Sequence, residues 1–177
     1  MLKTHAHRHE NALISGIIIP VMEEKERGKE EKEKENGKET VVCVSGYFDP
    51  IHRGHIEYLR MASDLGDRLI AILNNDKQAI AKKGFVFMPM DDKIAVLKAI
   101  RYVDEVVVSI DEDQTQCRTL EMLKPDIFAK GGDRYAYEIP EAEVCRRLGI
   151  RIIDGLGPKI QSSSELVKKA AESKKNG

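Results

Sequence analysis

Short apolar runs alternate along this chain with segments whose apolar residues recur at helical spacing. The apolar runs predict five strands, at residues 41–44, 68–73, 105–110, 127–129 and 150–153. Because these runs are dominated by Val, Ile and Leu, the strands are expected to be buried on both faces. The helical spacing predicts helices at residues 52–65, 90–100, 114–123, 140–148 and 163–173, and residues 77–90 are predicted to form a loop.

Strands that alternate with helices predict an α/β fold, here a single doubly wound parallel sheet of five strands with helices on both faces. In such a sheet, ligands bind beyond the carboxyl ends of the strands, where the strand order switches. Residues with glycine, lysine, histidine or hydroxyl groups follow four of the predicted strands, at 45–55, 82–84, 130–133 and 162–164. Their gathering at one edge predicts a single site there.

Composition fits one domain of ordinary size, because 41% of the 177 residues are hydrophobic and 33% are charged. We expect an N-terminal extension over residues 1–39, a folded domain over residues 40–172 and a tail over residues 173–177. The net charge of -1 gives no global attraction for nucleic acid or an acidic membrane, so neither is an expected partner. Three scattered cysteines form no metal-binding or disulfide pattern and favour a cytoplasmic location.

The extension carries no identifiable chemistry. Its alternating His5, His7 and His9 lack a nearby carboxylate or cysteine that would complete a metal site. The apolar stretch 12–22 is too short to span a bilayer, and residues 23–39 mix Glu and Lys as a solvated helix or a disordered segment would. Met22 is an alternative start of the chain.

Candidate chemistry is concentrated between the first predicted strand and the helix after it. His52 and His55 are three residues apart, so both side chains leave the same face of that helix near its N-terminus. Unpaired backbone N–H groups and the positive end of the helix dipole attract phosphate at that position. Gly46 and Gly54 leave room for a ligand to approach the backbone. The arrangement predicts a phosphate site with two imidazole donors.

Residues 46–55, GYFDPIHRGH, resemble the G-x-F-D-x-x-H-x-G-H signature of the cytidylyltransferase-like nucleotidyltransferases. The resemblance extends over about residues 40–169. It implies a Rossmann-like nucleotidyltransferase fold and an enzyme that joins a nucleoside triphosphate to a small phosphorylated alcohol or sugar and releases pyrophosphate. It also implies Mg²⁺ bound with the triphosphate, no dedicated metal ligands in the protein, and a homodimer.

The same resemblance implies residue roles. His52, His55, Lys82 and Lys83 would be catalytic and contact the triphosphate. Nucleotide-binding positions would be Gly46, Tyr47, Phe48, Asp49, Gly54, Lys93, Lys130, Gly131, Gly132, Asp133, Ser162, Ser163 and Ser164. Lys93 stands where the family often has arginine, which would weaken its grip on phosphate. Asp49 has two open roles, holding the turn backbone or holding the acceptor or a metal ion.

The nucleotide is left open between CTP and ATP. Residues 100–106 resemble glycerol-phosphate cytidylyltransferases, whereas residues 130–133 resemble the adenylyltransferase domain of heptose-nucleotide synthesis proteins. We place CTP ahead of ATP, with a heptose-phosphate-type adenylyltransferase as the alternative. A nucleotide-binding module without turnover, and a partner-binding protein acting through its charged extension, are the other hypotheses.

Overall fold

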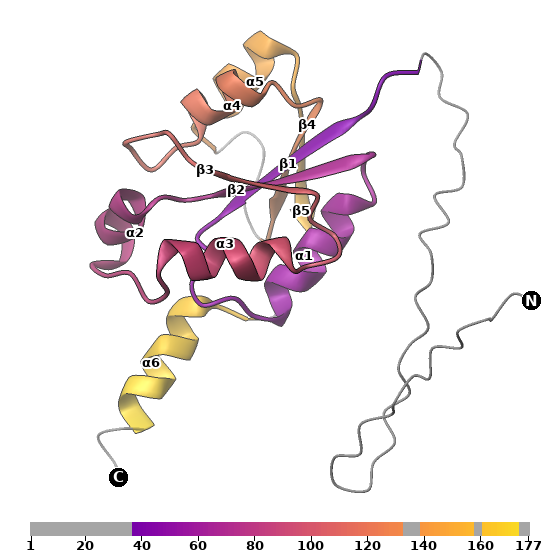
Figure 1. Cartoon of the computed structure of the whole chain (residues 1–177). Coiled ribbons are helices and arrows are strands. Elements are labelled where there is room, and N and C mark those ends of the chain that lie inside the picture. Colours follow the sequence, from indigo (N-terminus) through magenta and orange to yellow (C-terminus); the bar gives the residue numbers. More distant parts are fainter. Residues whose placement is uncertain (1–36, 133–138, 158–160, 174–177) are drawn as a thin grey trace, which may run out of the picture. The chain divides into compact units, whose positions relative to one another are not determined.

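Five parallel strands form one sheet in the computed structural model, which describes residues 37–132, 139–157 and 161–173 (Figure 1). The strands are β1 (Val41–Gly46), β2 (Arg68–Leu73), β3 (Glu105–Val108), β4 (Ile127–Gly131) and β5 (Arg151–Leu156). Their order in the sheet is β3-β2-β1-β4-β5, and every neighbouring pair is parallel. The predicted α/β fold with a five-stranded parallel sheet is therefore confirmed.

Helices cover both faces of this sheet. They are α1 (Arg53–Ser63), α2 (Asp76–Lys83), α3 (Met90–Lys98), α4 (Cys117–Leu123), α5 (Ala142–Leu148) and α6 (Ser163–Ser173). α1 and α3 lie on one face and α4 and α5 on the other, whereas α6 projects away from the sheet (Figure 1). Within the described ranges, none of the helices has the length and apolarity that crossing a membrane requires.

Two hydrophobic clusters, one on each face of the sheet, fill the space between the sheet and its helices. Val42, Leu59 and Leu97 belong to the cluster under α1 and α3. Cys43 and Leu120 belong to the cluster under α4 and α5. Successive residues of β1 thus point to opposite faces and both find apolar partners, as the unbroken apolar run predicted.

The segment predicted as a loop after β2 contains a helix, α2, so that prediction was wrong for residues 77–83. Two reciprocal hydrogen bonds of 3.0 Å form its N-terminus: Asn75 Oδ1 accepts from the Gln78 N–H, and Gln78 Oε1 accepts from the Asn75 N–H. Gly84, in the left-handed conformation at φ +83°, ends the helix. α2 positions Lys82 and Lys83 in its last turn.

The strand order switches at β1, which lies between β2 and β4. Chain crossovers run from β1 toward β2 and β3 in one direction, and then to β4 and β5 in the other, so a crevice opens beyond the carboxyl ends of β1 and β4. The residues that follow these two strands are the β1–α1 turn and residues 130–132. Residues 1–36 and 174–177 lie outside the described part, and the expected domain boundaries stay predictions.

Replacing Leu59 by alanine tests whether α1 is held by burial of its apolar face. Leu59 has no exposed surface, so Leu59→Ala should lower the free energy of unfolding by about 2–5 kcal/mol. Glu57→Ala removes a side chain of the same helix that is 43% exposed, and should change this free energy by less than about 0.5 kcal/mol. Urea unfolding followed by circular dichroism measures both, and equal losses in the two variants would contradict this packing.

Candidate active site

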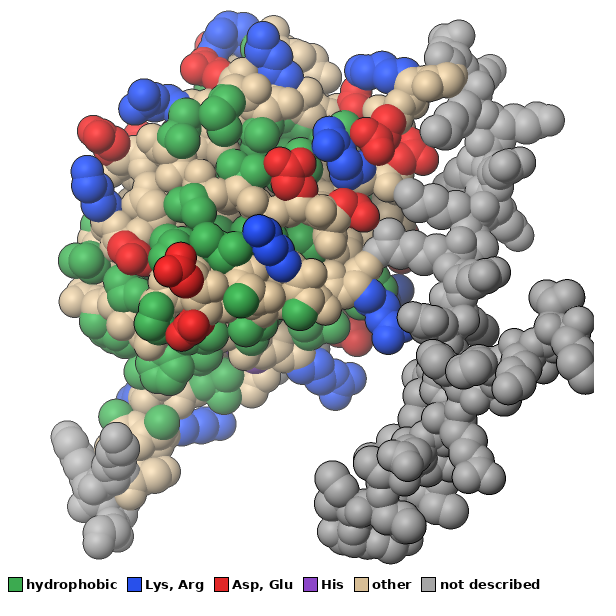
Figure 2. Space-filling view, viewed as in Figure 1, with side chains coloured by type: hydrophobic (Ala, Val, Ile, Leu, Met, Phe, Trp, Pro, Cys, Tyr) green, Lys and Arg blue, Asp and Glu red, His purple; other side chains and the backbone are tan. Residues whose placement is uncertain are grey.

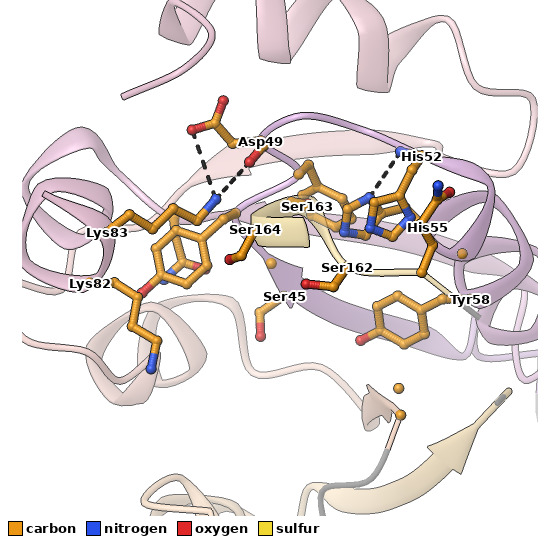
Figure 3. Close-up of a pocket in the computed structure, with 18 of the residues that line it drawn as sticks. Ser45, Asp49, His52, His55, Tyr58, Lys82, Lys83, Ser162, Ser163 and Ser164 are labelled. Carbon is orange, nitrogen blue, oxygen red and sulfur yellow. Dashed lines mark hydrogen bonds and ion pairs between the residues drawn. The ribbon is translucent and has the colours of Figure 1, made fainter. Parts of the chain in front are cut away.

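A cavity of about 940 Å³ opens at the carboxyl ends of the strands. Its walls include the β1–α1 turn, the end of α2, the end of β4 and the start of α6, which are far apart in the sequence (Figure 3). The structure brings these predicted residues to its walls: Gly46, Tyr47, Phe48, Asp49, His52, Gly54, His55, Lys82, Lys83, Lys130, Gly131, Gly132, Ser162, Ser163 and Ser164. Asp133 lies outside the described residues.

Lys93 is the described candidate that does not line the cavity. Its side chain is buried, with 1% of the residue exposed, and its Nζ lies 3.2 Å from Asp76 Oδ1 at the start of α2. The structure therefore gives Lys93 a contact between α3 and α2, and its role in binding nucleotide stays a prediction.

His52 and His55 form a stacked pair. Their ring centroids are 3.8 Å apart and the ring planes differ by 17°. The backbone N–H of His52 donates to His55 Nδ1 at 3.2 Å, so the proton of a neutral His55 ring is on Nε2. Phe48, 2% exposed, contacts the His55 ring edge-on at 5.0 Å between centroids. These contacts hold both imidazoles on one face of α1 at its N-terminus, as the spacing predicted (Figure 3).

Both imidazoles are neutral at pH 7 in the free protein. Burial lowers the pKa of His55 from 6.5 to about 3, with further lowering by His52 and Lys83. Burial also lowers the pKa of His52. Among the described residues, His52 Nδ1 is buried and has no hydrogen-bond partner. The pair therefore offers N–H donors to an anion without the desolvation cost of two buried cations.

Asp49 connects the β1–α1 turn to the segment between α2 and α3. Its carboxylate, in a residue only 1% exposed, accepts hydrogen bonds from the backbone N–H groups of Phe87 at 3.1 Å and Met88 at 2.7 Å. Lys83 Nζ donates to the Asp49 carbonyl oxygen at 2.6 Å. Of the two roles left open by the sequence, this geometry supports the structural one, because both carboxylate oxygens already have backbone partners.

The lysines at the end of α2 are differently placed. Lys83 reaches back to Asp49, whereas Lys82 points in another direction (Figure 3). The pKa of Lys83 is lowered, chiefly by burial. The positive charge of Lys93 also lowers this pKa, and the nearby Asp49 carboxylate partly offsets both effects. Among the described residues, Lys82, Lys83, Lys130 and Lys168 line the cavity against two carboxylates, those of Asp49 and Glu141. The excess of lysines suits an anionic ligand.

The end of β4 approaches α1 very closely. A Cβ atom at Gly131 would lie 2.8 Å from Cδ2 of Tyr58, whose hydroxyl donates to the Ala129 carbonyl oxygen at 2.7 Å. Next to this contact, Lys130 Nζ donates to Ser45 Oγ at 3.1 Å and connects β4 to β1. The cavity floor is thus fixed at the strand switch.

The start of α6 is attached to the turn that carries the histidines. Ser163 Oγ donates to the Pro50 carbonyl oxygen at 2.9 Å. Ser162 and Ser164 also line the cavity, and the Ser162 carbonyl oxygen accepts from the Leu166 N–H at 3.1 Å, within the first turn of the helix. This hydroxyl-rich helix start therefore lines the cavity beside the histidine turn (Figure 3).

Sequence reasoning missed the glutamine and glutamate side of the cavity. Gln114, Gln116 and Glu141 line it, and the backbone N–H of Gln116 donates to Glu141 Oε1 at 2.9 Å. Gln116 Oε1 is buried without a partner among the described residues. No motif marks these residues, but Gln114 and Gln116 follow β3, and that position beyond the carboxyl end of a strand was the available signal.

The chain resembles known proteins in both sequence and fold. The family model described as cytidylyltransferase-like matches residues 43–169. The chain is 38% identical over 112 residues to FAD synthase of Pyrococcus abyssi, covering 63% of this chain and 75% of that protein. It is 37% identical over 140 residues to bifunctional protein HldE of Streptomyces coelicolor, covering 75% of this chain but only 29% of that protein.

A solved structure shows the same architecture. It is the lipopolysaccharide core biosynthesis protein of Thermoplasma volcanium, with a TM-score of 0.57 and 25% sequence identity. The alignment covers 66% of this chain and 96% of the other. This likeness agrees with the parallel α/β sheet described above.

The lowered histidine pKa values predict how stability depends on pH. Because the pKa of folded His55 is about 3 and the ordinary value is 6.5, the unfolded chain binds more protons between these pH values. The contribution of neutral His55 to the free energy of unfolding is therefore present above pH 6.5 and is lost as pH falls toward 3. Between pH 6.5 and pH 3, the free energy of unfolding of His55→Gln should fall less than that of the unaltered protein. Urea unfolding at a series of pH values measures it, and an unchanged slope would contradict the neutral buried imidazole.

Proposed function

The chain belongs to the cytidylyltransferase-like family of nucleotidyltransferases, and from this premise we propose that it transfers a nucleoside monophosphate from a nucleoside triphosphate to a small phosphate monoester. The observation that supports this most is the stacked pair His52 and His55 at the N-terminus of α1, facing a lysine-lined cavity. At about 940 Å³ the cavity is at the upper end of the range for small-molecule sites, about 300–1,000 Å³, which suits two substrates bound together.

The chemistry follows from the charges of the substrates. A phosphate monoester has a second pKa near ~6, so it is already a dianionic nucleophile at neutral pH and no strong base is required. An acceptor oxygen attacks the α-phosphorus in line, the bond from that phosphorus to the bridging oxygen breaks, and pyrophosphate leaves with the electron pair. The protein must therefore bring two anions together and stabilise the charge that develops.

The proposed roles divide the cavity between the two substrates. His52 and His55 donate N–H groups to the triphosphate, and residues 162–164 offer hydroxyls and a helix start on the other side of it. Residues 130–132 border the base and ribose. Lys82 and Lys83 lie at the end of α2, where their positive charges reduce the repulsion between the triphosphate and the acceptor.

Mg²⁺ is expected to enter this site bound to the triphosphate. Among the described residues, no three His, Cys, Asp or Glu side chains gather into a metal-ion site. The cavity carboxylates are those of Asp49, which hold backbone N–H groups, and Glu141, which accepts from Gln116. This set fits an ion whose ligands are mainly phosphate oxygens and water. Bound there, Mg²⁺ would neutralise part of the phosphate charge.

We favour ATP over CTP as the nucleotide. The sequence alone placed CTP ahead, on the resemblance of residues 100–106. A protein named FAD synthase makes a product in which an adenylyl group is joined to flavin mononucleotide, and two such proteins are among the relatives, at 38% and 44% identity. Adenylyl transfer is also what the resemblance of residues 130–133 implies.

The expected homodimer and cytoplasmic location stay predictions.

Release of pyrophosphate tests this function directly. The full-length protein with Mg²⁺ should release pyrophosphate from ATP only when a phosphate monoester is present, and more slowly or not at all from CTP. The acceptor panel contains glycerol 3-phosphate, a heptose 1-phosphate and flavin mononucleotide. Faster release from CTP would overturn the choice of nucleotide. No release with any pair would overturn the enzymatic proposal and favour a nucleotide-binding module without turnover.

Removing either imidazole should lower turnover with the fold intact. His52→Ala and His55→Ala each take one donor from the triphosphate, so kcat should fall by on the order of 10²-fold or more. Arg60→Ala, which removes an exposed side chain from the same helix, is the matched control and should retain kcat. Thermal unfolding of each variant shows that the chain still folds. Turnover within a factor of two of the unaltered protein in both histidine variants would remove them from the mechanism.

A further inference from the structure

One wall of the cavity combines positive charge with exposed aromatic surface. Lys82 and Lys83 end α2, and Phe85 follows two residues later; all three line the cavity with Tyr47 from the β1–α1 turn. Phe85 keeps 44% of its surface exposed. Hydrophobic side chains gather on the molecular surface over α2 and the segment that leads to α3 (Figure 2). We call Tyr47, Lys82, Lys83 and Phe85 the aromatic wall.

Phe85 is presented by a segment that is fixed to the body of the protein. Two and three residues beyond it, the N–H groups of Phe87 and Met88 donate to the buried Asp49 carboxylate. On its other side, Lys83 Nζ donates to the Asp49 carbonyl oxygen. Hydrogen bonds to a buried charged group are among the stronger ones in proteins, so the turn between them is well anchored. The backbone that carries the exposed ring is therefore fixed, which reduces the entropy that a ligand must offset on stacking against it.

Tyr47 is held in the same way. Its hydroxyl donates to Gln114 Oε1 at 2.6 Å, and Lys83 Nζ lies 5.2 Å from the centre of its ring. A cation at this distance from an aromatic ring is attracted by the π-electrons. The wall thus offers a held aromatic ring, an exposed one and two ammonium groups on the side of the cavity formed by α2.

The proposed nucleotide site lies along β1, β4 and the start of α6, which leaves the α2 side of the cavity for the acceptor. An acceptor bound there would place its phosphate near Lys82 and Lys83 and its remaining part against Tyr47 and Phe85. A sugar or short polyol needs partners for several hydroxyls. Two aromatic rings offer it few, and the amide of Gln114 beside Tyr47 already bonds the Tyr47 hydroxyl and the Gln78 carbonyl oxygen. A planar ring covers the exposed Phe85 surface and gains stacking energy in addition to burial.

We propose that the acceptor is a phosphate monoester that carries a planar aromatic ring, which stacks on the aromatic wall. This inference rests on the proposed nucleotidyl transfer and names the class of its second substrate. The assignment makes Phe85 a specificity-determining residue, because it contacts the part of the acceptor that distinguishes an aromatic phosphate from a sugar phosphate.

Flavin mononucleotide is the probe for the acceptor class. With ATP and Mg²⁺, the full-length protein should show a kcat/KM for flavin mononucleotide at least about 10²-fold above those for glycerol 3-phosphate and the heptose phosphate. Equal or better use of either aliphatic acceptor would overturn the inference and leave nucleotidyl transfer standing. If no acceptor supports pyrophosphate release, binding of flavin mononucleotide is measured instead, by the quenching of its fluorescence on titration with the protein. The aromatic wall requires that flavin mononucleotide binds, so no quenching would overturn the inference.

Two phenylalanines of one turn provide a matched pair of variants. Phe85→Ala should raise the KM or Kd for flavin mononucleotide roughly 10-fold, equivalent to ~1.4 kcal/mol, and leave the KM for ATP unchanged. Phe87→Ala, which removes a ring that is 52% exposed but does not line the cavity, should leave both constants unchanged. Phe85→Tyr keeps a flat ring and should bind like the unaltered protein.

Equal behaviour of the two alanine variants would overturn the stacking role of Phe85. If both variants instead shift the sedimentation coefficient toward a smaller species, the exposed side chains are an interface between copies of the chain, and the inference fails. Unfolding midpoints close to that of the unaltered protein establish that each variant still folds.

Discussion

The site depends on the buried carboxylate of Asp49. Its two oxygens accept the N–H groups of Phe87 and Met88, and its backbone carbonyl accepts from Lys83. These contacts join the turn after β1 to the end of α2 and the segment that follows it, which lie more than thirty residues further along the chain. The histidine turn, the lysines of α2 and the exposed ring of Phe85 therefore share one anchor. A buried carboxylate is stable there because backbone donors replace the water that it has lost.

The histidine pair shows why neutral groups serve at a site for polyanions. Two charged imidazoles with centroids 3.8 Å apart would repel each other in a partly buried place next to Lys83. Uncharged, they stack, and each keeps one N–H to donate. A bound triphosphate would favour protonation, since negative charge raises the pKa of a neighbouring base. The free protein thus avoids buried positive charge on its imidazoles. Once a triphosphate is bound, its negative charge can compensate that positive charge.

The parallel sheet followed from the sequence because buried parallel strands leave plain apolar runs, whereas the strand order that places the switch at β1 was not predicted. The histidine turn followed from a ten-residue pattern. α2 was missed because its N-terminus depends on a reciprocal side-chain pair, Asn75 and Gln78, in a stretch without clear helical spacing. Lys93 was predicted at the nucleotide by analogy, but its orientation is decided by Asp76, a partner that only the three-dimensional arrangement reveals. Gln116 and Glu141 come from the starts of two short helices and carry no motif.

The close approach of α1 to β4 has a consequence for how this chain can change over evolutionary time. The ring of Tyr58 occupies the space that any side chain at Gly131 would need, with 2.8 Å left to the first added carbon. The sizes of the two residues are therefore coupled: a larger residue at 131 requires a smaller one at 58. Such a swap would also remove the hydroxyl that bridges to Ala129. A side chain at 131 is therefore excluded while Tyr58 is present, and the distance between α1 and β4 is set by the two positions together.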